Sequence, residues 1–453
     1  MNKSQLDKIF KAYDIRGLAP QELNPHVSHA IGRGFADFLP KGKVAVGRDM
    51  RKESGELADA LIAGLVMQGR EVIDLGLITS DMIYYAVGKL KLAGGAIITA
   101  SHNPGQYDGI KLTGKGVVPI GIDTGLLKIE TEIETGHYKK LCKKGCDNGQ
   151  VTNLYITEQW VKHAIQIIGG LHTAMPIATD TGNGMAAIVL PYLQKYTHLK
   201  IDSLFAELDG SFPNHPANPL EPNNTKQLRK LVVTNKLACG LAFDGDGDRV
   251  FIVDDQGNLL SASVLGAIIA RYILENDPGQ TILYSATASD IVPATIESFG
   301  GKSVRTRVGH SFVKAEMKSH HAVFGAEHSG HFYFASNFNA DSGLITALTI
   351  LKIITEARRP LSEIAAPFES MFANSGELNF GITDAQESLM ALERHFYDGE
   401  TDHLDGLTIR FRDWWFNARS SNTEPFLRVN IEANSQEILV IHQKEITKLL
   451  KHK

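Results

Sequence analysis

Residues 43–100 read KVAVGRDMRKESGELADALIAGLVMQGREVIDLGLITSDMIYYAVGKLKLAGGAIITA, and this stretch indicates the fold class. Its apolar, β-branched runs at 43–48, 71–75 and 95–100 have the composition of buried strands. The stretches between them, 54–68 and 80–89, have the pattern of helices. Strands that alternate with helices in this way predict parallel α/β layering.

The same alternation recurs twice further along the chain. The additional strands are predicted at 176–181, 200–206, 239–243, 281–285, 302–306 and 322–325. The additional helices are predicted at 153–168, 184–196, 225–235, 261–274, 290–299, 311–318 and 343–356. Each of the three rounds sends one polar loop from the carboxyl end of a strand, at 99–104, 244–249 and 327–331. That end is where open α/β sheets bind ligands.

The last eighty or so residues have a different pattern. Short strands are predicted at 378–382, 407–411, 414–417 and 427–431, with helices near 386–396 and 435–450. This is typical of a separate, smaller α+β module with a polar loop at 419–425. We therefore predict four domains, with boundaries at 1–150, 151–254, 255–368 and 369–453.

Composition bounds the function. The chain has 453 residues, 43% of them hydrophobic and 21% charged, which excludes a disordered or fibrous protein. A formal net charge of -5 disfavours a nucleic-acid partner. No apolar run approaches the roughly 20 residues needed to cross a bilayer, and the N-terminal residues lack a secretory apolar stretch. We expect a cytoplasmic protein without a membrane partner.

The three cysteines do not support a structural disulfide or zinc framework. Cys142 and Cys146 have the spacing of half a zinc site, but they lie among lysines and no second cysteine pair follows. With Cys239 as the third cysteine, the count suits a reducing compartment.

The loop at 99–104 offers a nucleophile. Ser101 follows an apolar strand and precedes an Asn-Pro turn, so its hydroxyl is expected at an exposed strand end. A serine there can act as a nucleophile or carry a phosphoryl group. The alternative is a turn serine that bonds nearby amides. His102 and Lys111 favour the functional interpretation, because both can transfer protons.

The loop at 244–249 reads DGDGDR and predicts a metal site. Asp244, Asp246 and Asp248 alternate with glycines and can converge on one hard cation. The alternative is a solvated acidic turn. An EF-hand is excluded, because its sixth position holds Arg249 and its twelfth holds Asp255.

Two further loops favour recognition of a phosphorylated sugar. Glu327 and Ser329 lie two apart, and in extended chain they would face the same way and suit adjacent sugar hydroxyls. His310, at the start of a predicted helix, is a candidate acid or base. The loop at 419–425 combines an arginine with hydroxyls and an amide, which suits a phosphate. The alternatives are a loop that bonds its own backbone at 327–331, a packed side chain for His310, and a solvent-facing turn at 419–425.

Five segments in this order resemble the α-D-phosphohexomutase family, the phosphomannomutases and phosphoglucomutases. They are KAYDIRG at 11–17, TASHNP at 99–104, DGDGDR at 244–249, EHSGH at 327–331 and RSSNTEP at 419–425. The resemblance covers essentially the whole chain. It implies four domains around a central cleft, the first three of related α/β topology with mixed sheets.

The resemblance also implies roles for the loop residues. Ser101 would be the phosphoserine, and Asp244, Asp246 and Asp248 would bind Mg²⁺ beside it. Lys111 and His310 would assist proton transfer. The residues implied to line the substrate site are Tyr13, Arg16, Arg249, Glu327, Ser329, Arg419, Ser421, Asn422 and Thr423. A hexose 1,6-bisphosphate would be the intermediate and activator.

The chain departs from the family pattern at one place. Members often carry an Asp-X-Lys/Arg segment where residues 284–289 read YSATAS, so Thr287 stands at a position where a cation is often found. His328 resembles the phosphomannomutase/phosphoglucomutase branch, whereas the phosphoglucosamine mutases usually carry Gln there.

The expected function is a Mg²⁺-dependent mutase that interconverts mannose 6-phosphate and mannose 1-phosphate, with the glucose pair also considered. A phosphoglucosamine mutase and a catalytically weakened sugar-phosphate-binding homologue are the alternatives, and Thr287 favours the second. An acyl hydrolase using Ser101 would lack a Gly-X-Ser-X-Gly elbow and would leave the three aspartates without a role. The oligomeric state, monomer or homodimer, stays open.

Overall fold

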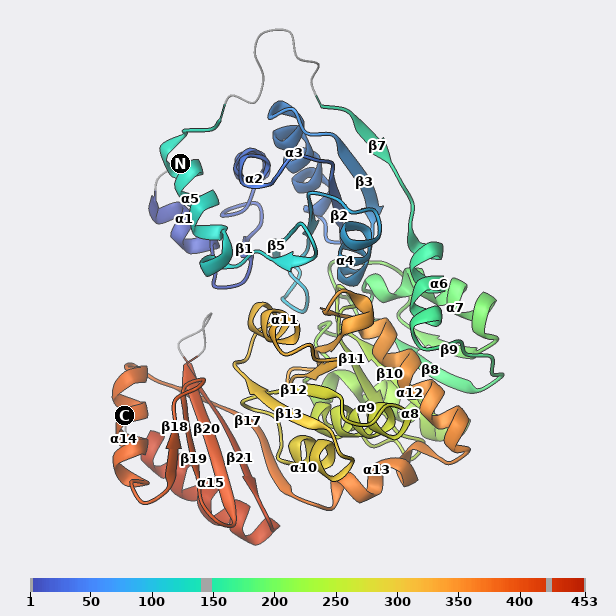
Figure 1. The fold of residues 1–453 in the computed structure, drawn as a ribbon, viewed down its shortest axis with the longest axis vertical. Helices are drawn as coiled ribbons and strands as arrows, with labels where there is room; N and C mark the ends of the chain where they lie inside the picture. The colour runs from blue at the N-terminus through green and yellow to red at the C-terminus, as the bar shows by residue number, and fades with distance from the viewer. Residues whose placement is uncertain (1–2, 140–148, 421–425, 452–453) are drawn as a thin grey trace. The chain divides into compact units, whose positions relative to one another are not determined.

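The computed structural model describes residues 3–139, 149–420 and 426–451 (Figure 1). It divides into two compact units. The first contains the chain up to Leu260 together with Ser329–Ser362, and the second contains Ser261–His328 together with the chain from Glu363 onward.

The first sheet contains the stretch that predicts the fold class. Its successive elements are β2 (Val44–Arg48), α3 (Ser54–Met67), β3 (Val72–Leu77), α4 (Ser80–Lys89) and β4 (Gly94–Ile98), so all five predicted elements are confirmed. The remaining strands of this sheet are β1 (Ile15–Leu18), β5 (Tyr107–Gly114), β6 (Val118–Pro119) and β7 (Val151–Asn153). The strand order is β1-β5-β4-β2-β3-β7, with β6 beside β5. Because β2 runs parallel to β3 and β4 whereas β5 is antiparallel to β4, the sheet is mixed.

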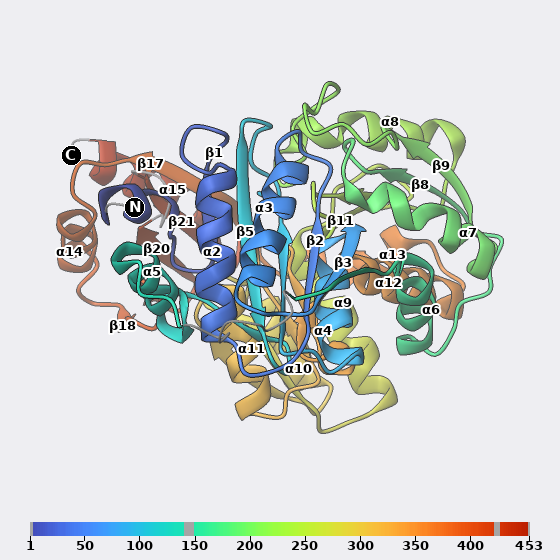
Figure 2. The ribbon, with the colours of Figure 1, turned by 90° about the horizontal axis from the view of Figure 1, so that it is seen from above.

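Successive residues of β4 face opposite sides of this sheet, and different helices cover the two sides. A Cβ on Gly95 would lie 2.7 Å from Val87, so this position faces α4. The neighbouring Ala96 and Ile98 belong to the core shared with α3 and with α2 (Pro25–Phe38). Figure 2 shows α2 and α3 side by side over the strands. The helices α1 (Lys3–Ile9) and α5 (Leu126–Thr135) extend the same core.

The second sheet supplies the acidic loop. Its strands are β8 (Pro176–Asp180), β9 (Lys200–Leu204), β10 (Gly240–Phe243) and β11 (Val250–Val253), in the order β11-β10-β8-β9. The helices of this part are α6 (Thr157–Ile167), α7 (Leu190–Thr197) and α8 (Lys226–Asn235). The helix predicted from Gly184 begins instead as a 3-10 turn at Met185–Val189. Pro191 has no N–H for the carbonyl of Ala187, so α-helical bonding cannot start earlier.

The third set of alternating strands and helices is divided between the two units. In the second unit, β12 (Thr281–Ser285) lies in parallel between β13 (Lys302–Thr306) and β14 (Phe324–Ala326). The helices of this part are α9 (Ala262–Asn276), α10 (Ile291–Ser298) and α11 (His310–Ser319). In the first unit, β15 (Phe332–Phe334) pairs with β16 (Ala340–Asp341) and precedes α12 (Gly343–Ala357). The linking helix is α13 (Leu361–Glu369).

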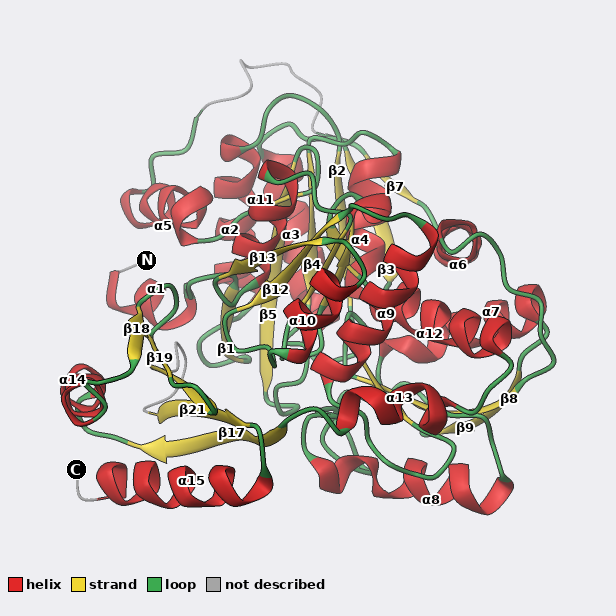
Figure 3. Ribbon diagram, turned by 60° about the horizontal axis from the view of Figure 1, so that its bottom comes forward, coloured by secondary structure: helices red, strands yellow, loops and turns green. Residues whose placement is uncertain are grey.

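The fourth sheet, in the second unit, is antiparallel. Its strands are β17 (Ala373–Gly381), β18 (Glu400–Asp402), β19 (Leu407–Arg410), β20 (Trp414–Ser420) and β21 (Phe426–Ala433), in the order β17-β21-β20-β19-β18. The helices are α14 (Ala385–His395) and α15 (Gln436–Lys451), and Figure 3 shows α15 along β17 and β21. The predicted α+β module is confirmed. The sequence does not reveal β18, because its three residues are polar.

Among the described residues, no helix combines the length and the apolar character that a membrane span requires. The expected domain boundaries remain predictions.

Candidate active site

Ser101 lies just beyond the end of β4, as predicted from the polar loop that follows this strand. Its φ is 51°, in the left-handed region, where a residue with a Cβ is disfavoured by about 1–2 kcal/mol. The expectation that its hydroxyl is exposed is wrong, because the residue is buried at 5% exposure. Its backbone N–H donates to Thr99 Oγ1 at 3.0 Å. Strained conformations of this kind cluster at functional sites.

The acidic loop joins β10 to β11. Asp244, Asp246 and Asp248 are each at most 1% exposed, and one carboxylate oxygen of each lies within 4.8 Å of the other two. Glycine is required between them, because a Cβ on Gly245 would lie 2.5 Å from the carbonyl oxygen of Ser101, and Gly247 has a φ of 74°. The predicted convergence of the three aspartates is confirmed.

The serine and the aspartates meet in the first unit. Ser101 Oγ donates to Asp244 Oδ2 at 2.8 Å, although the two residues are 143 positions apart. Arg249 Nη2 donates to the same serine oxygen at 3.2 Å and to Asp244 Oδ2 at 2.8 Å. The Ser101 hydroxyl, the Asp244 carboxylate and the Arg249 guanidinium therefore form one buried hydrogen-bonded cluster.

Lys111, from β5, joins the aspartates from the other side. Its Nζ lies 2.7 Å from Asp246 Oδ2 and 2.6 Å from Asp248 Oδ2. Ser80, at the start of α4, donates to Asp246 Oδ2 at 2.6 Å. These contacts occupy one oxygen of each of the two aspartates. Within the described chain, the other oxygens, Asp246 Oδ1 and Asp248 Oδ1, are buried without a hydrogen-bond partner.

These buried and unsatisfied carboxylate oxygens fit a hard divalent cation, which prefers oxygen ligands. Burial raises the pKa of Asp244 to about 7. Burial also raises the pKa of Asp246, but Lys111, Ser80 and Arg249 together hold that pKa below its ordinary value. The acidic cluster could bind a metal ion, as predicted.

His102 and Arg16 lie around the serine. His102 Nδ1 is 3.3 Å from Ser101 Oγ and also contacts Arg249 Nη2. Burial, and then the charge of Arg249, lowers the pKa of His102 well below its ordinary value, so its imidazole is neutral at pH 7. Arg16, in β1, donates to the Asn103 side chain in the same loop. Tyr13 is half-buried just before β1.

The remaining candidates lie elsewhere. Glu327 and His310 belong to the second unit, where Glu327 Oε1 accepts from the N–H of Gly309 at 2.8 Å. Ser329 belongs to the first unit, and its Oγ lies 2.9 Å from His331 Nδ1. The assumption of extended chain between Glu327 and Ser329 is wrong, because residues 328–329 form a turn and Gly330 has a φ of 87°.

In the fourth sheet, Arg419 lies at the end of β20 rather than in a loop. Its Nη2 is 3.4 Å from Glu377 Oε2, and Arg428 Nη1 is 3.3 Å from Glu377 Oε1. The rest of the expected phosphate loop, including Ser421, Asn422 and Thr423, lies outside the described residues. Cys142 and Cys146, the half zinc site, also lie outside them.

Thr287 is buried in the second unit. Its Oγ1 lies 3.4 Å from Ser285 Oγ. Cys239 is buried and unpaired.

Some functional neighbours are not evident from the sequence. Ser80 could have been suspected, because it follows β3 at the carboxyl edge of the sheet. His331 Nε2 lies 3.8 Å from Asp248 Oδ1, and with Asp341 these residues form a second group of metal-ligand type. Asp341 has no motif signal, because it is an isolated acidic residue before a helix.

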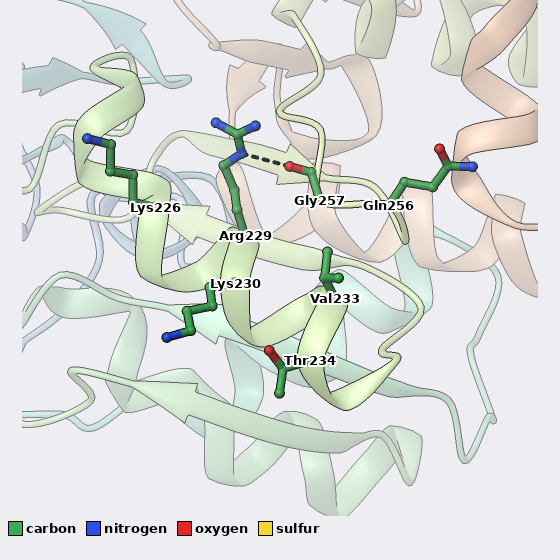
Figure 4. Close-up of a pocket in the computed structure, with 7 residues that line it drawn as sticks. All are labelled: Lys226, Arg229, Lys230, Val233, Thr234, Gln256 and Gly257. Atoms are coloured by element: carbon green, nitrogen blue, oxygen red, sulfur yellow. Dashed lines mark hydrogen bonds between the residues drawn. The ribbon is translucent and has the colours of Figure 1, made fainter.

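A separate hollow of about 340 Å³ lies on α8 and the turn at Gln256 (Figure 4). Arg229 lines this hollow, and its Nε donates to the carbonyl of Gly257 at 2.7 Å. Its other cations, Lys226 and Lys230, are exposed. None of the residues that surround Ser101 lines this hollow.

Comparison with known proteins agrees with this geometry. Models of the phosphoglucomutase/phosphomannomutase α/β/α domains I, II and III match residues 7–140, 158–257 and 262–371, and the model of the C-terminal domain matches residues 377–448. The chain belongs to the phosphoglucomutase/phosphomannomutase family. It is therefore an enzyme of the isomerase class, an intramolecular phosphotransferase. The four α/β and α+β parts predicted from the sequence are those of this family.

Relatives extend over the whole chain. A protein named "Phosphohexose mutases" from Xanthomonas campestris pv. campestris is 35% identical over 445 residues, 98% of this chain and 99% of the relative. A phosphomannomutase from Salmonella montevideo is 33% identical over 97% of this chain and 98% of its own. A solved structure of a phosphoglucomutase/phosphomannomutase family protein from Burkholderia thailandensis superposes with a TM-score of 0.88 at 28% identity, covering 100% of this chain and 98% of that one.

Proposed function

We propose that this family member interconverts hexose 6-phosphates and hexose 1-phosphates through a phosphoserine at Ser101 and a hexose 1,6-bisphosphate intermediate. One observation carries the proposal: Ser101 Oγ lies 2.8 Å from Asp244 in a cluster of three buried aspartates, a buried arginine and the half-buried Lys111. Phosphoryl transfer depends mainly on in-line positioning and charge neutralisation, and this cluster is suited to both.

Asp244, Asp246 and Asp248 would hold a Mg²⁺ ion, together with the group on Ser101. The ion would supply charge stabilisation for the transferring phosphoryl group. Arg249 already donates to the serine oxygen and would stabilise an equatorial phosphoryl oxygen in the same way. Lys111 pairs with Asp246 and Asp248, offsets one of their two negative charges and fixes their orientation.

The transfer requires one proton acceptor and one donor. In the first half-reaction the Oγ–P bond of phospho-Ser101 breaks, a sugar hydroxyl forms the new O–P bond, and its proton leaves. His102 is the proposed acceptor of that proton, because its imidazole is neutral and its Nδ1 lies 3.3 Å from Ser101 Oγ. The protonated imidazole, whose pKa is low, can then pass the proton on to the serine oxygen. Burial lowers the pKa of Lys111, but Asp246 and Asp248 raise it well above its ordinary value, so Lys111 stays an ammonium and would assist the transfer through its positive charge. In the second half-reaction the O–P bond at the other end of the bisphosphate breaks and Ser101 Oγ forms the new O–P bond. The serine proton passes through His102 to the sugar oxygen, which becomes a hydroxyl group.

Recognition of the sugar is assigned to the second unit and to Ser329. Glu327 and Ser329 would bind sugar hydroxyls, His310 would assist proton transfer, and Arg419 with Ser421, Asn422 and Thr423 would bind the phosphate that does not react. Tyr13 and Arg16 would line the place where the sugar meets Ser101. Mannose is the proposed hexose, because the relatives from Salmonella and Escherichia coli are named phosphomannomutases.

A catalytically weakened sugar-phosphate-binding protein is the second candidate, and Thr287 is the observation that favours it. Its short hydroxyl side chain is buried against Ser285 and supplies no positive charge. Binding of a hexose phosphate without turnover would support this alternative.

A coupled assay tests the proposal. The purified chain is given Mg²⁺, a trace of glucose 1,6-bisphosphate, and either mannose 1-phosphate or glucose 1-phosphate, and the appearance of the 6-phosphate is followed. We expect turnover of both, faster with mannose 1-phosphate. The Ser101→Ala variant should retain the fold and lose most of the activity. Turnover by this variant at the normal rate would overturn the role of Ser101.

A further inference from the structure

Arg51, just after β2, is one of the few fully buried cations of the first unit, with 3% exposure. Its Nη1 donates to the carbonyl oxygens of Pro104 and Tyr107, both at 2.9 Å. Its Nη2 donates to the carbonyl oxygens of Ser101 at 2.8 Å and Asn103 at 2.7 Å. One guanidinium therefore binds four backbone oxygens of a single loop.

That loop has little other support from secondary structure. Residues 101–106 lie between β4 and β5, where buried carbonyl groups need partners that no sheet ladder provides. Ser101 is held in the left-handed region, and such a conformation persists only where the surroundings fix it. The fork of Arg51 is the contact that binds the carbonyl of Ser101 itself.

Arg51 is held in place in turn. Its Nε donates to Asp49 Oδ2 at 3.1 Å, and its backbone N–H donates to Asp49 Oδ1 at 2.9 Å. Phe212, buried in the loop before η3 (Pro222–Thr225), lies with its ring centroid 5.0 Å from the guanidinium carbon. All of the guanidinium nitrogens are engaged, so the group has one orientation.

Behind Asp49 lies a second carboxyl group. Ser54 Oγ is 2.7 Å from Asp49 Oδ1 and 2.8 Å from Asp108 Oδ2. A serine has one hydroxyl proton, so both contacts are hydrogen bonds only if one carboxyl group is protonated and donates to Ser54. With one neutral and one ionised carboxyl group, the charge of Arg51 is balanced and the buried anchor is neutral.

From this arrangement we infer that Arg51 is a positioning residue for the phosphoryl-carrying serine: it fixes the backbone of residues 101–107 so that Ser101 Oγ points at the aspartate cluster. The inference rests on the proposed function for the role of Ser101, but the hold of Arg51 on the loop is independent of it. Lysine cannot replace arginine here, because an ammonium offers at most three donors from one atom and has no fork.

The test compares Arg51→Lys with a matched control, Arg70→Lys. Arg70 is also a buried arginine of the first unit, at 8% exposure, and its guanidinium donates to backbone carbonyls that include those of Leu39 and Pro40, both at 2.6 Å. Those carbonyls follow α2 and are not part of the serine loop. Both variants lose the same kind of contact, so a purely structural effect would appear in both.

Two readouts are measured. In the coupled assay, Arg51→Lys should lower kcat by about 10²-fold while KM changes little, since misplacement of a reacting group by about 1 Å has an effect of this size. Arg70→Lys should leave kcat and KM close to those of the unmodified chain. In hydrogen exchange followed by mass spectrometry, a peptide covering residues 101–107 should exchange faster in Arg51→Lys and not in Arg70→Lys.

The outcomes distinguish a failure of the proposed function from a failure of the role assigned to Arg51. If the unmodified chain shows no turnover, the proposed function fails, and the exchange of residues 101–107 still decides whether Arg51 holds the loop. Unchanged exchange there, or a kcat for Arg51→Lys equal to that for Arg70→Lys, would overturn the inference. If Arg51→Lys does not fold, Asp49→Asn takes its place, because it weakens the anchor of the guanidinium without removing the fork. It should give a smaller effect of the same kind, and no effect would overturn the inference.

Discussion

Replacement of Asp108 by asparagine should remove a pH dependence from the stability of the first unit. Asp108 is 1% exposed. Its Oδ1 accepts from the N–H of Gly109 at 2.8 Å, and its Oδ2 contacts Ser54 Oγ at 2.8 Å. An asparagine fits the same place: its carbonyl accepts from Gly109, and its amide donates to Ser54. Ser54 is then free to donate to Asp49.

The size and sign of the effect follow from the pKa of Asp108. Burial, and then the neighbouring charge of Asp49, raises this pKa to about 7, with Arg51 opposing the change. Because the folded chain holds the proton more tightly than the unfolded chain, the contribution to stability is complete below pH about 4. It is lost as the pH rises to about 7. The difference between about 7 and the ordinary value of 3.8 corresponds to an upper limit of about 4 kcal/mol.

The free energy of unfolding is measured in urea at several values between pH 5 and pH 8 for the unmodified chain and Asp108→Asn. Hydrogen exchange of peptides from β2 and β5 assigns the change to this place. We expect Asp108→Asn to gain about 1–4 kcal/mol relative to the unmodified chain between pH 5 and pH 8. Asp384→Asn is the control, because Asp384 is an exposed helix cap, for which asparagine is an equal substitute. Parallel pH curves for Asp108→Asn and the unmodified chain would refute the assignment of a raised pKa to Asp108.

Three further predictions concern other parts of the chain. Asp246→Asn should raise the Mg²⁺ concentration for half-maximal activity about tenfold or more, because it removes a ligand charge; an unchanged Mg²⁺ titration would contradict the metal assignment. Glu377→Gln should lower KM for mannose 1-phosphate about threefold, because under the proposed function Glu377 would compete with the substrate phosphate for Arg419 and Arg428, with which it forms ion pairs. Steady-state kinetics would show a higher KM if Glu377 instead orients the arginines. Phe416→Ala, in the core of the fourth sheet at 0% exposure, should destabilise the second unit by about 3–5 kcal/mol, and a calorimetric scan without a lowered transition would contradict this.

The sequence predicts the architecture because it is encoded locally. The apolar runs that become β4 and β10 are short, continuous and followed by polar loops, so the positions of Ser101 and Asp244 at strand ends could be inferred before their contact was known. The meeting of these two residues, 143 positions apart and at the ends of strands in two different sheets, could be expected only from the family resemblance.

The parts that could not be predicted depend on contacts between distant segments. Nothing near Arg51 in sequence reveals that its guanidinium binds the carbonyls of residues 101–107, because backbone oxygens leave no sequence signal. The left-handed conformation of Ser101 is equally hidden, since serine gives no sign of it. Glu377 lies in β17, and its pairing with Arg419 depends on how β17, β21 and β20 are paired.

The central claim is that the Ser101 hydroxyl carries the phosphoryl group in transit, and peptide mapping by mass spectrometry tests it most directly. The dephosphorylated chain is incubated with Mg²⁺ and glucose 1,6-bisphosphate, digested and mapped, and a second sample is then exposed to mannose 1-phosphate. The account predicts one phosphoryl group on Ser101 in both samples. When the glucose 1,6-bisphosphate carries an 18O-labelled phosphoryl group, it also predicts that the label on Ser101 is replaced by the unlabelled phosphoryl group of mannose 1-phosphate in the second sample. Turnover with Ser101 unmodified, or with the phosphoryl group on another residue, would contradict it.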